Sequence, residues 1–432
     1  MEFCENLIKW HTARPEYAMA EAADRYFKHD SDINRFVRFL YNHLGGKVKD
    51  IWSPNNKIGT NLHFYFTVQI VQFILGNGIT FGKEDTKDKL GDDFEKQIDG
   101  ALTDALNGGA SYLYWNMNHV LTYTFQEFIP LLDEDDGTIK AGVRWWKLAD
   151  DRPLRYTLYE MDGFTKYVHN PEKEPTVLEN KRAYKYSPPS APDADDAVGE
   201  NYPGFPIIPL YSMTGESTLY GNKNTIDALD LAVSGMVNNV TDEMIYWVLK
   251  GCGAYESDAE IEEFIEKLHM LKAVNIGEDQ TAEPHSVEPP YQASSTAIER
   301  LERQLYQDYM ALDVRQISGA AVTATQIKAA YEPLNAKAKM LETNLTSALK
   351  KVMELAGIDD TPAYKEAKIV NTGEEIQSIM QSVQLIGTKE ATRQVCRLLG
   401  IGDRTDEIIR ERESEEEKRI KDMLNQNGGI TE

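Results

Sequence analysis

Residues 314–356 read VRQISGAAVTATQIKAAYEPLNAKAKMLETNLTSALKKVMELA, a run of small residues followed by a long amphipathic stretch. The small-residue run, 314–323, predicts a loop, and Gly319 within it can adopt backbone conformations closed to other residues. Apolar residues then recur every three or four positions over 326–356, which predicts a helix with one apolar face. Pro333 lies inside that helix and removes one backbone hydrogen bond, so we expect a kink there.

Two more helices are predicted before this loop. Residues 225–250 carry one apolar face, and the glycines that follow end the helix. A second helix opens at a capping box, 296–299, and has apolar residues along one side. The stretch between them, 251–291, predicts a short α/β insert with one helix (261–270) and one strand (271–276).

The N-terminal half combines helices with strands. Residues 1–50, 61–75 and 92–107 predict helices, whereas 110–168 are rich in aromatic and β-branched residues and predict strands. Asp-Gly dipeptides at 136–137 and 162–163 mark hairpin turns. The chain from Glu374 onward predicts helices again, and its charged run 411–421 is typical of a solvated helix. The predicted fold class is therefore α+β.

The balance of charge limits the kinds of partner. Lys and Arg number 46 and Asp and Glu number 70, so the formal charge of the 432 residues is −24. A chain this acidic, with no basic block, does not fit a tight, sequence-reading nucleic-acid binder. Three widely spaced cysteines indicate neither a disulfide framework nor a zinc site. No signal peptide or membrane span is apparent, so we expect no membrane partner.

Motifs for catalysis and for cofactors are missing from the sequence. There is no phosphate-binding loop, no dinucleotide fingerprint, no nucleophile elbow and no zinc-binding helix. The acidic run 133–137 resembles a calcium loop only superficially, because it lacks the alternation and the distal Glu, and a solvated hairpin turn fits it better. We therefore predict no catalytic residue, no cofactor and no metal, and a protein that is not an enzyme.

Several short motifs, taken in order, resemble the portal (head-to-tail connector) proteins of tailed bacteriophages. They are PNNKI at 54–58, LGNGI at 75–79, FPIIPLY at 205–211, the helix 226–251 with its final LKG, and Ser318-Gly319 before the Pro-containing helix. The closest branch is that of long-tailed phages of Gram-positive hosts. The resemblance covers about residues 5–420, and it is carried by the order and spacing of the motifs because no single motif is diagnostic.

This resemblance implies a portal fold, with long stem helices, an α/β wing and clip, and a helical C-terminal crown. The implied parts are the wing at 1–224, the first stem helix at 225–250, the clip at 251–291, the second stem helix at 292–313, the tunnel loop at 314–323, the kinked wing helix at 324–357 and the crown at 358–432.

The resemblance also implies a function. The chain would form a ring, with twelve subunits, around a channel at one vertex of the capsid. Double-stranded DNA would be packaged and ejected through it without sequence-specific binding. The implied protein partners are the terminase large subunit, which would supply ATP hydrolysis, a head-tail adaptor, and the major capsid and scaffolding proteins. The protein would belong to the portal vertex of the virion, and to the host cytoplasm during assembly.

The expected channel residues lie in and beside the loop. They are Arg315, Gln316, Ile317, Ser318, Gly319, Ala320, Ala321 and Val322. Arg315 and Lys328 are candidates for contact with the DNA backbone, and a surface salt bridge is the alternative for each. The loop itself has an alternative interpretation as an ordinary helix–helix connection.

The acidity of the two stem helices suggests how DNA would be held. Residues 225–250 carry Asp227, Asp230, Asp242 and Glu243 against Lys250, and 296–313 carry four acids against Arg300 and Arg303. If these faces line a channel, its wall repels phosphate. Two other functions remain open. One is a carboxylate-based hydrolase of polymers, with a sugar cleft formed by the aromatic strands 112–159. The other is a different virion protein, such as a minor head protein.

Overall fold

The computed structural model describes residues 1–41, 46–50, 53–83, 85–149, 151–170, 174–187, 198–241, 245–250, 281–286, 290–317, 323–365, 372–398 and 402–427. The chain divides into two compact units. Unit 1 comprises 1–312 with 333–365, and unit 2 comprises 313–332 with 366–432. The mixed helices and strands confirm the α+β class.

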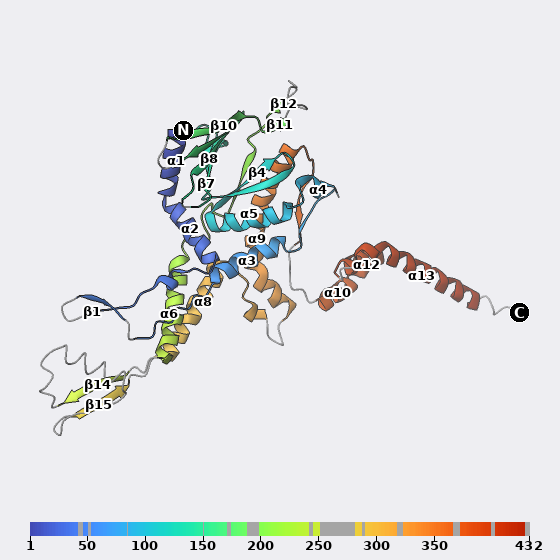
Figure 1. The fold of residues 1–432 in the computed structure, drawn as a ribbon. Coiled ribbons are helices and arrows are strands. Elements are labelled where there is room, and N and C mark those ends of the chain that lie inside the picture. Colours follow the sequence, from blue (N-terminus) through green and yellow to red (C-terminus); the bar gives the residue numbers. More distant parts are fainter. Residues whose placement is uncertain are drawn as a thin grey trace. The chain divides into compact units, whose positions relative to one another are not determined.

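An antiparallel sheet of five strands, in the order β10-β9-β8-β7-β6, forms one layer of unit 1 (Figure 1). Its strands are β6 (Phe128–Leu132), β7 (Ile139–Lys147), β8 (Leu154–Glu160), β9 (Gly163–His169) and β10 (Thr176–Arg182). Helix α1 (Glu2–Thr12) packs on it, with Cys4 and Ile8 against Val143 and Tyr156. Both predicted Asp-Gly turns are confirmed, since each joins neighbouring antiparallel strands.

A second sheet, in the order β13-β4-β5, packs against helix α5 (Phe94–Gly108). Its strands are β4 (Ala110–Asn116), β5 (His119–Thr124) and β13 (Ile207–Tyr211). The aromatic residues of the predicted strands lie in the core, each at most 6% exposed: Tyr112, Tyr114, Trp115, Tyr123, Tyr156 and Tyr159. These rings are occupied in packing, so they do not form the open sugar cleft that the hydrolase interpretation requires.

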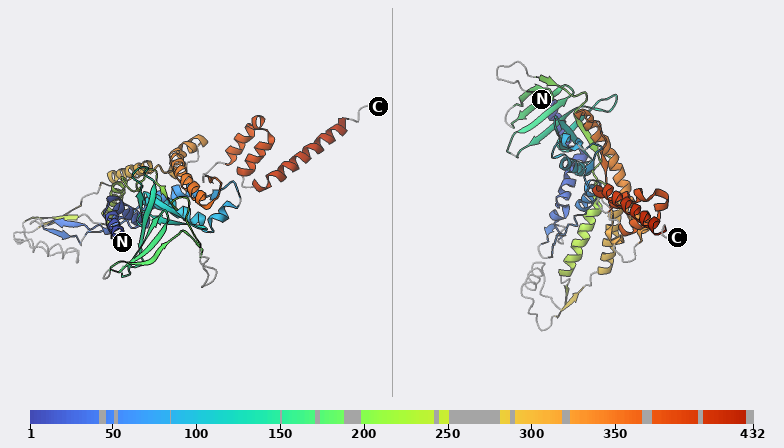
Figure 2. Two further views of the ribbon diagram at one scale, coloured as in Figure 1. Left: turned by 90° about the horizontal axis from the view of Figure 1, so that it is seen from above. Right: turned by 90° about the vertical axis from the view of Figure 1, so that its right-hand side faces the viewer.

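A group of helices forms the other part of unit 1. It contains α2 (Pro15–Phe27), α3 (Leu62–Leu75), α6 (Lys223–Thr241) and α8 (Tyr291–Asp308). Ala23, Phe66, Leu229, Leu305 and Tyr309 belong to one buried cluster that joins these helices. Helices α6 and α8 run side by side in both ribbon views (Figures 1 and 2).

Shorter elements complete unit 1. They are η1 (Asp32–Arg35), β1 (Phe39–Tyr41), β2 (Lys47–Lys49), β3 (Ile79–Thr80), α4 (Thr86–Leu90), β11 (Lys185–Ser187), β12 (Val198–Glu200), β14 (Ile245–Lys250), β15 (Thr281–Ser286) and β16 (Ala363–Tyr364). The predicted helix over 1–50 is wrong for its last part, because β1 pairs with β2. This segment contains Phe, Tyr and Val, which favour a strand.

The predicted helix 225–250 is also wrong at its end. Helix α6 stops at Thr241, and β14 pairs with β15 in antiparallel register. The sequence of β14 is IYWVLK, whose aromatic and β-branched residues favour an extended strand once a partner strand is available. Residues 251–280, which include the predicted short helix and strand of the insert, lie outside the described residues.

Residues 314–356 also differ in detail from their prediction. Val314–Ile317 form one 3₁₀ turn, η2, rather than loop, and Ser318 to Val322 lie outside the described residues. Helix α9 (Ala324–Ala356) begins two residues before its predicted start and contains Pro333, as expected. The kink at that proline stays a prediction. Helix α8 starts at Tyr291, five residues before the predicted capping box.

Unit 2 is helical beyond residue 372, as predicted. Its elements there are α10 (Thr372–Gln381), α11 (Val383–Ile386), α12 (Thr388–Leu398), η3 (Gly402–Arg404) and α13 (Thr405–Asn427). The charged run 411–415 is exposed, which agrees with the predicted solvated helix. Within the described ranges, no helix is both long and apolar enough to cross a membrane.

Candidate functional site

The buried carboxyl group of Asp230 holds helix α6 in place. This residue is fully buried in the middle of α6. Its Oδ1 accepts hydrogen bonds from the backbone N–H of Thr60, at 2.8 Å, and from the Thr60 hydroxyl, at 2.7 Å. Its Oδ2 accepts a third from the Ser31 hydroxyl, at 2.9 Å. A buried carboxyl group is costly unless it is hydrogen-bonded, and these three contacts meet that need.

The next two turns of α6 also form hydrogen bonds to the segment that precedes Thr60. The Ser234 hydroxyl accepts a hydrogen bond from the Ile58 N–H at 2.9 Å. Asn238 accepts from the Asn56 N–H at 2.7 Å and donates to the Asn56 carbonyl at 3.2 Å. Positions four apart lie on one helix face, so Asp230, Ser234 and Asn238 form a polar ladder. The motif 54–58 is therefore bound to α6 through its backbone.

The first turn of α6 is fixed by an ion-pair network. Lys223 Nζ lies 2.5 Å from Asp32 and 2.7 Å from Asp227, and the Tyr26 hydroxyl donates to Asp227. Although partial burial opposes it, hydrogen bonding to the carboxylates of Asp227 and Asp32 raises the pKa of Lys223. Asp227 and Asp230 are thus engaged within the subunit, and the expected repulsion of phosphate by the acidic helices stays a prediction.

The end of α8 is bound to α3. The Gln69 side-chain amide donates to the Leu312 carbonyl at 3.0 Å and accepts from the Leu312 N–H at 2.9 Å. His63 Nε2 lies 3.0 Å from Asn107 Oδ1, which can only accept, so Nε2 carries the proton. His63 Nδ1 consequently accepts from the Tyr309 hydroxyl at 2.9 Å. Complete burial lowers the pKa of His63 to about 4, which keeps the ring neutral.

Lys337 of α9 also contacts the end of α8. Its Nζ donates to the Tyr309 carbonyl at 2.8 Å, and the side chain is only 3% exposed. Burial lowers the pKa of Lys337 to about 8. Together, the contacts of Leu312, Tyr309 and Lys337 fix the chain on both sides of the segment 313–332.

The structure describes only some of the predicted channel residues, and it places these in different elements. Arg315 Nε lies 2.9 Å from Asp313 Oδ1, which is the salt bridge considered as its alternative role. Gln316 and Ile317 belong to η2, and Lys328 is exposed on α9. Ser318, Gly319, Ala320, Ala321 and Val322 lie outside the described residues.

Sequence reasoning missed the ladder and the buried residues around Tyr309. Polar residues spaced four apart on an otherwise apolar helix are a signal that could have identified Asp230, Ser234 and Asn238. His63 and Lys337 give no comparable signal. Over the described ranges, no group of three or more His, Cys, Asp or Glu residues is arranged to hold a metal ion.

A pocket of about 750 Å³ between α2 and α5 collects carboxyl groups. Asp104 lines it with Asp24 and Glu127. Burial, together with the negative charges of these two neighbours, raises the pKa of Asp104 to about 7. Arg25 and Lys28 line the same pocket and supply positive charge. The neighbouring carboxylates in this pocket therefore disfavour the ionised form of Asp104.

Comparisons with known proteins show the family of the chain. The family model "Phage portal protein, SPP1 Gp6-like" matches residues 8–400. The portal protein of Bacillus phage SPP1 is 21% identical over 393 residues, which cover 83% of this chain and 76% of that protein. The portal protein of Clostridium phage phiCD119 is 20% identical over 403 residues, covering 85% and 86% respectively.

Two solved structures also align with the chain. The virion of a native gene transfer agent particle gives a TM-score of 0.43 at 11% identity, covering 76% of this chain and 87% of the other. The neck of that particle, with C12 symmetry, gives 0.42 at 10% identity, covering 77% and 89%. Since the family model spans most of the sequence, the chain belongs to the SPP1 Gp6-like phage portal proteins, which are structural proteins and not enzymes.

Proposed function

We propose that this portal protein forms a closed ring of twelve subunits at one vertex of the capsid. Double-stranded DNA would enter the head through its central channel during packaging and leave through it during ejection. The observation that carries this proposal is the family match over 8–400. A minor head protein is not favoured, because both curated relatives are portal proteins.

The parts of the chain would divide this work. We assign the stem to α6 and α8 with the neighbouring residues of 225–250 and 292–313. The clip is the insert 251–291, which includes β15 and directly follows its partner strand β14. The wing is 1–224 with the helix 324–357. The crown is 358–432. The ladder of Asp230, Ser234 and Asn238 supports this division, because it joins the first stem helix to the wing along two turns.

The tunnel loop, 314–323, would contact the DNA. Ser318, Gly319, Ala320 and Ala321 are small residues, and glycine permits backbone conformations that are closed to other residues. The anchors at Tyr309 and Lys337 support this role, because they hold the chain before and after the loop at fixed positions. Arg315 and Lys328 are the proposed contacts to DNA phosphate beside the loop.

The other proposed partners of the ring are proteins that act in packaging and in head assembly. The terminase large subunit would dock on the ring and hydrolyse ATP, and a head-tail adaptor would bind after packaging. The major capsid and scaffolding proteins would surround the ring while the head assembles in the host cytoplasm. The finished ring would then remain at the portal vertex of the virion.

A deletion tests the role of the loop. Phage carrying a portal without Ser318–Ala321 should package or retain much less DNA, while the purified variant still forms rings of normal size. A deletion of 134–137, in the exposed turn between β6 and β7, serves as the matched control and should package normally. Normal packaging by the loop deletion, or loss of its rings, would refute the proposed role.

A further inference from the structure

Helix α8 has one solvent-exposed face that its partner α6 does not cover. The side chains on this face recur at helical spacing and are all exposed: Gln292, Thr296, Arg300, Arg303, Gln304 and Gln307. We call this set the arginine face. The opposite side of the helix carries Ile298, Leu301 and Leu305, which pack in the helical cluster of unit 1.

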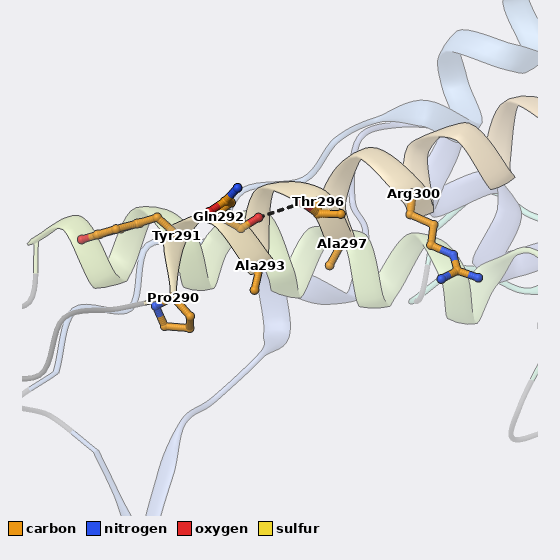
Figure 3. Close-up of a pocket in the computed structure, with 7 residues that line it drawn as sticks. All are labelled: Pro290, Tyr291, Gln292, Ala293, Thr296, Ala297 and Arg300. Carbon is orange, nitrogen blue, oxygen red and sulfur yellow. Dashed lines mark hydrogen bonds between the residues drawn. The ribbon is translucent and has the colours of Figure 1, made fainter.

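The arginine face is hollowed where α8 begins. A groove of about 980 Å³ follows the first turns of the helix and is lined by Ala293, Thr296, Ala297 and Arg300 among others. Figure 3 shows Ala293, Ala297 and Arg300 projecting from the same side of α8. The small alanine side chains leave room for another molecule to come close to the helix, beside the guanidinium of Arg300.

The charges on this face differ from those elsewhere on the two helices. Among the described contacts, neither Arg300 nor Arg303 takes part in an ion pair, although two exposed acids, Glu299 and Asp308, border the face. Glu302 is half-buried on the other side of α8. On the described part of α6, the one cation, Lys223, is engaged by two carboxylates. The arginine face is therefore where the helix pair offers positive charge to a partner.

We propose that the arginine face contacts the phosphate backbone of the DNA duplex. This inference rests on the proposed function, and it replaces the expectation of a stem wall that only repels phosphate. Arg300 and Arg303 lie about 4.5 Å apart along the helix axis, and double-stranded DNA carries one phosphate charge per about 1.7 Å. Gln and Thr side chains around them offer neutral hydrogen bonds, so the contact is weak and independent of sequence.

The test measures binding of a 30-base-pair duplex to purified rings by fluorescence anisotropy between 25 and 200 mM salt. The double variant Arg300→Gln/Arg303→Gln should bind the duplex at least fivefold more weakly at low salt. The slope of the logarithm of its binding constant against the logarithm of the salt concentration should be smaller in magnitude by about one or more. Arg300→Lys/Arg303→Lys should bind within about twofold of the wild type, because it keeps the charge. The matched control Lys9→Gln/Lys147→Gln removes two exposed wing cations and should leave binding unchanged.

Light scattering on every variant separates the outcomes. Unchanged DNA binding by the Gln variant would overturn the proposal. Loss of rings in the Gln variant, with recovery in the Lys variant, would also overturn it, because the face would then be a contact between copies of the chain. If the wild type itself forms no rings, or its rings bind no duplex, the proposed function fails rather than the assignment of this face.

Discussion

The ammonium group of Lys337 donates a hydrogen bond of 2.8 Å to the backbone carbonyl of Tyr309, where helix α8 has just ended. The last carbonyls of a helix lack partners within the helix and carry partial negative charge. Lys337 supplies a donor and a positive charge at that position, and its Nζ also lies 5.6 Å from the Tyr309 ring centroid. Lys337 of α9 thus caps the C-terminal end of α8, the second proposed stem helix.

This contact predicts that stability rises with pH. Burial lowers the pKa of Lys337 to about 8 in the folded protein, whereas an unfolded lysine titrates near about 10.4. Between these values the unfolded chain binds more protons, so the free energy of unfolding increases with pH. We expect a gain of about 2 kcal/mol from pH 8 to 9.5, measured by urea unfolding. The range ends at pH 9.5 because tyrosines that are buried in the folded protein ionise in the unfolded chain above about pH 10, which lowers the free energy of unfolding.

The variant Lys337→Met provides the control for that measurement. It removes the titrating group and keeps much of the side-chain volume, so its free energy of unfolding should not rise from pH 8 to 9.5. A small fall is expected instead, because burial raises the pKa of the Cys4 thiol. The same rise in Lys337→Met and in the wild type would show that another group is responsible. Lys339→Met is a matched variant of an exposed lysine on α9 and should keep the rise.

The ladder predicts a graded loss of stability. Asp230→Ala leaves the Ser31 hydroxyl and both Thr60 donors without their acceptor, so we expect a loss of about 3 kcal/mol. Ser234→Ala removes one neutral hydrogen-bond acceptor and should cost about 1 kcal/mol. Hydrogen exchange should also accelerate at the Thr60 amide in the first variant. Equal effects of the two substitutions on urea unfolding would contradict the ladder.

The acidic pocket predicts a gain of stability. Burial and neighbouring carboxylates raise the pKa of Asp104 to about 7, so the folded state holds its proton over a range where the unfolded state has lost it. Stability due to this group therefore falls as pH rises from about 3.9 to 7. Asp104→Asn should stabilise the protein by about 1–2 kcal/mol at pH 7.5 and by much less at pH 4.5. A destabilised Asn variant at pH 7.5 would contradict this electrostatic account.

The helices and strands with strong periodic patterns were predictable from the sequence. Helices α3 and α5 match their predictions closely because their apolar residues recur over at least three turns. The end of α6 was not predictable in this way, since Val248 fits both a helix face and the strand β14. Pairing with β15 decides between them, and that contact joins residues more than 30 positions apart.

The candidate site was only partly predictable. The motif 54–58 indicated the family, but the role of its backbone depends on α6 side chains about 180 residues away. Lysine is rarely buried, so the sequence pattern of α9 gives no reason to expect Lys337 to be buried against the end of α8. Asp227 and Asp230 of α6 looked like a charged surface, because sequence alone does not reveal their partners Lys223, Ser31 and Thr60.

Electron microscopy of the purified chain tests the central claim most directly. Particles imaged across a range of salt and protein concentrations should be closed rings with a central pore, and class averages along the axis should show twelvefold symmetry. The family match leads to this expectation. Monomers or dimers under all conditions, or rings without an open pore, would contradict the account.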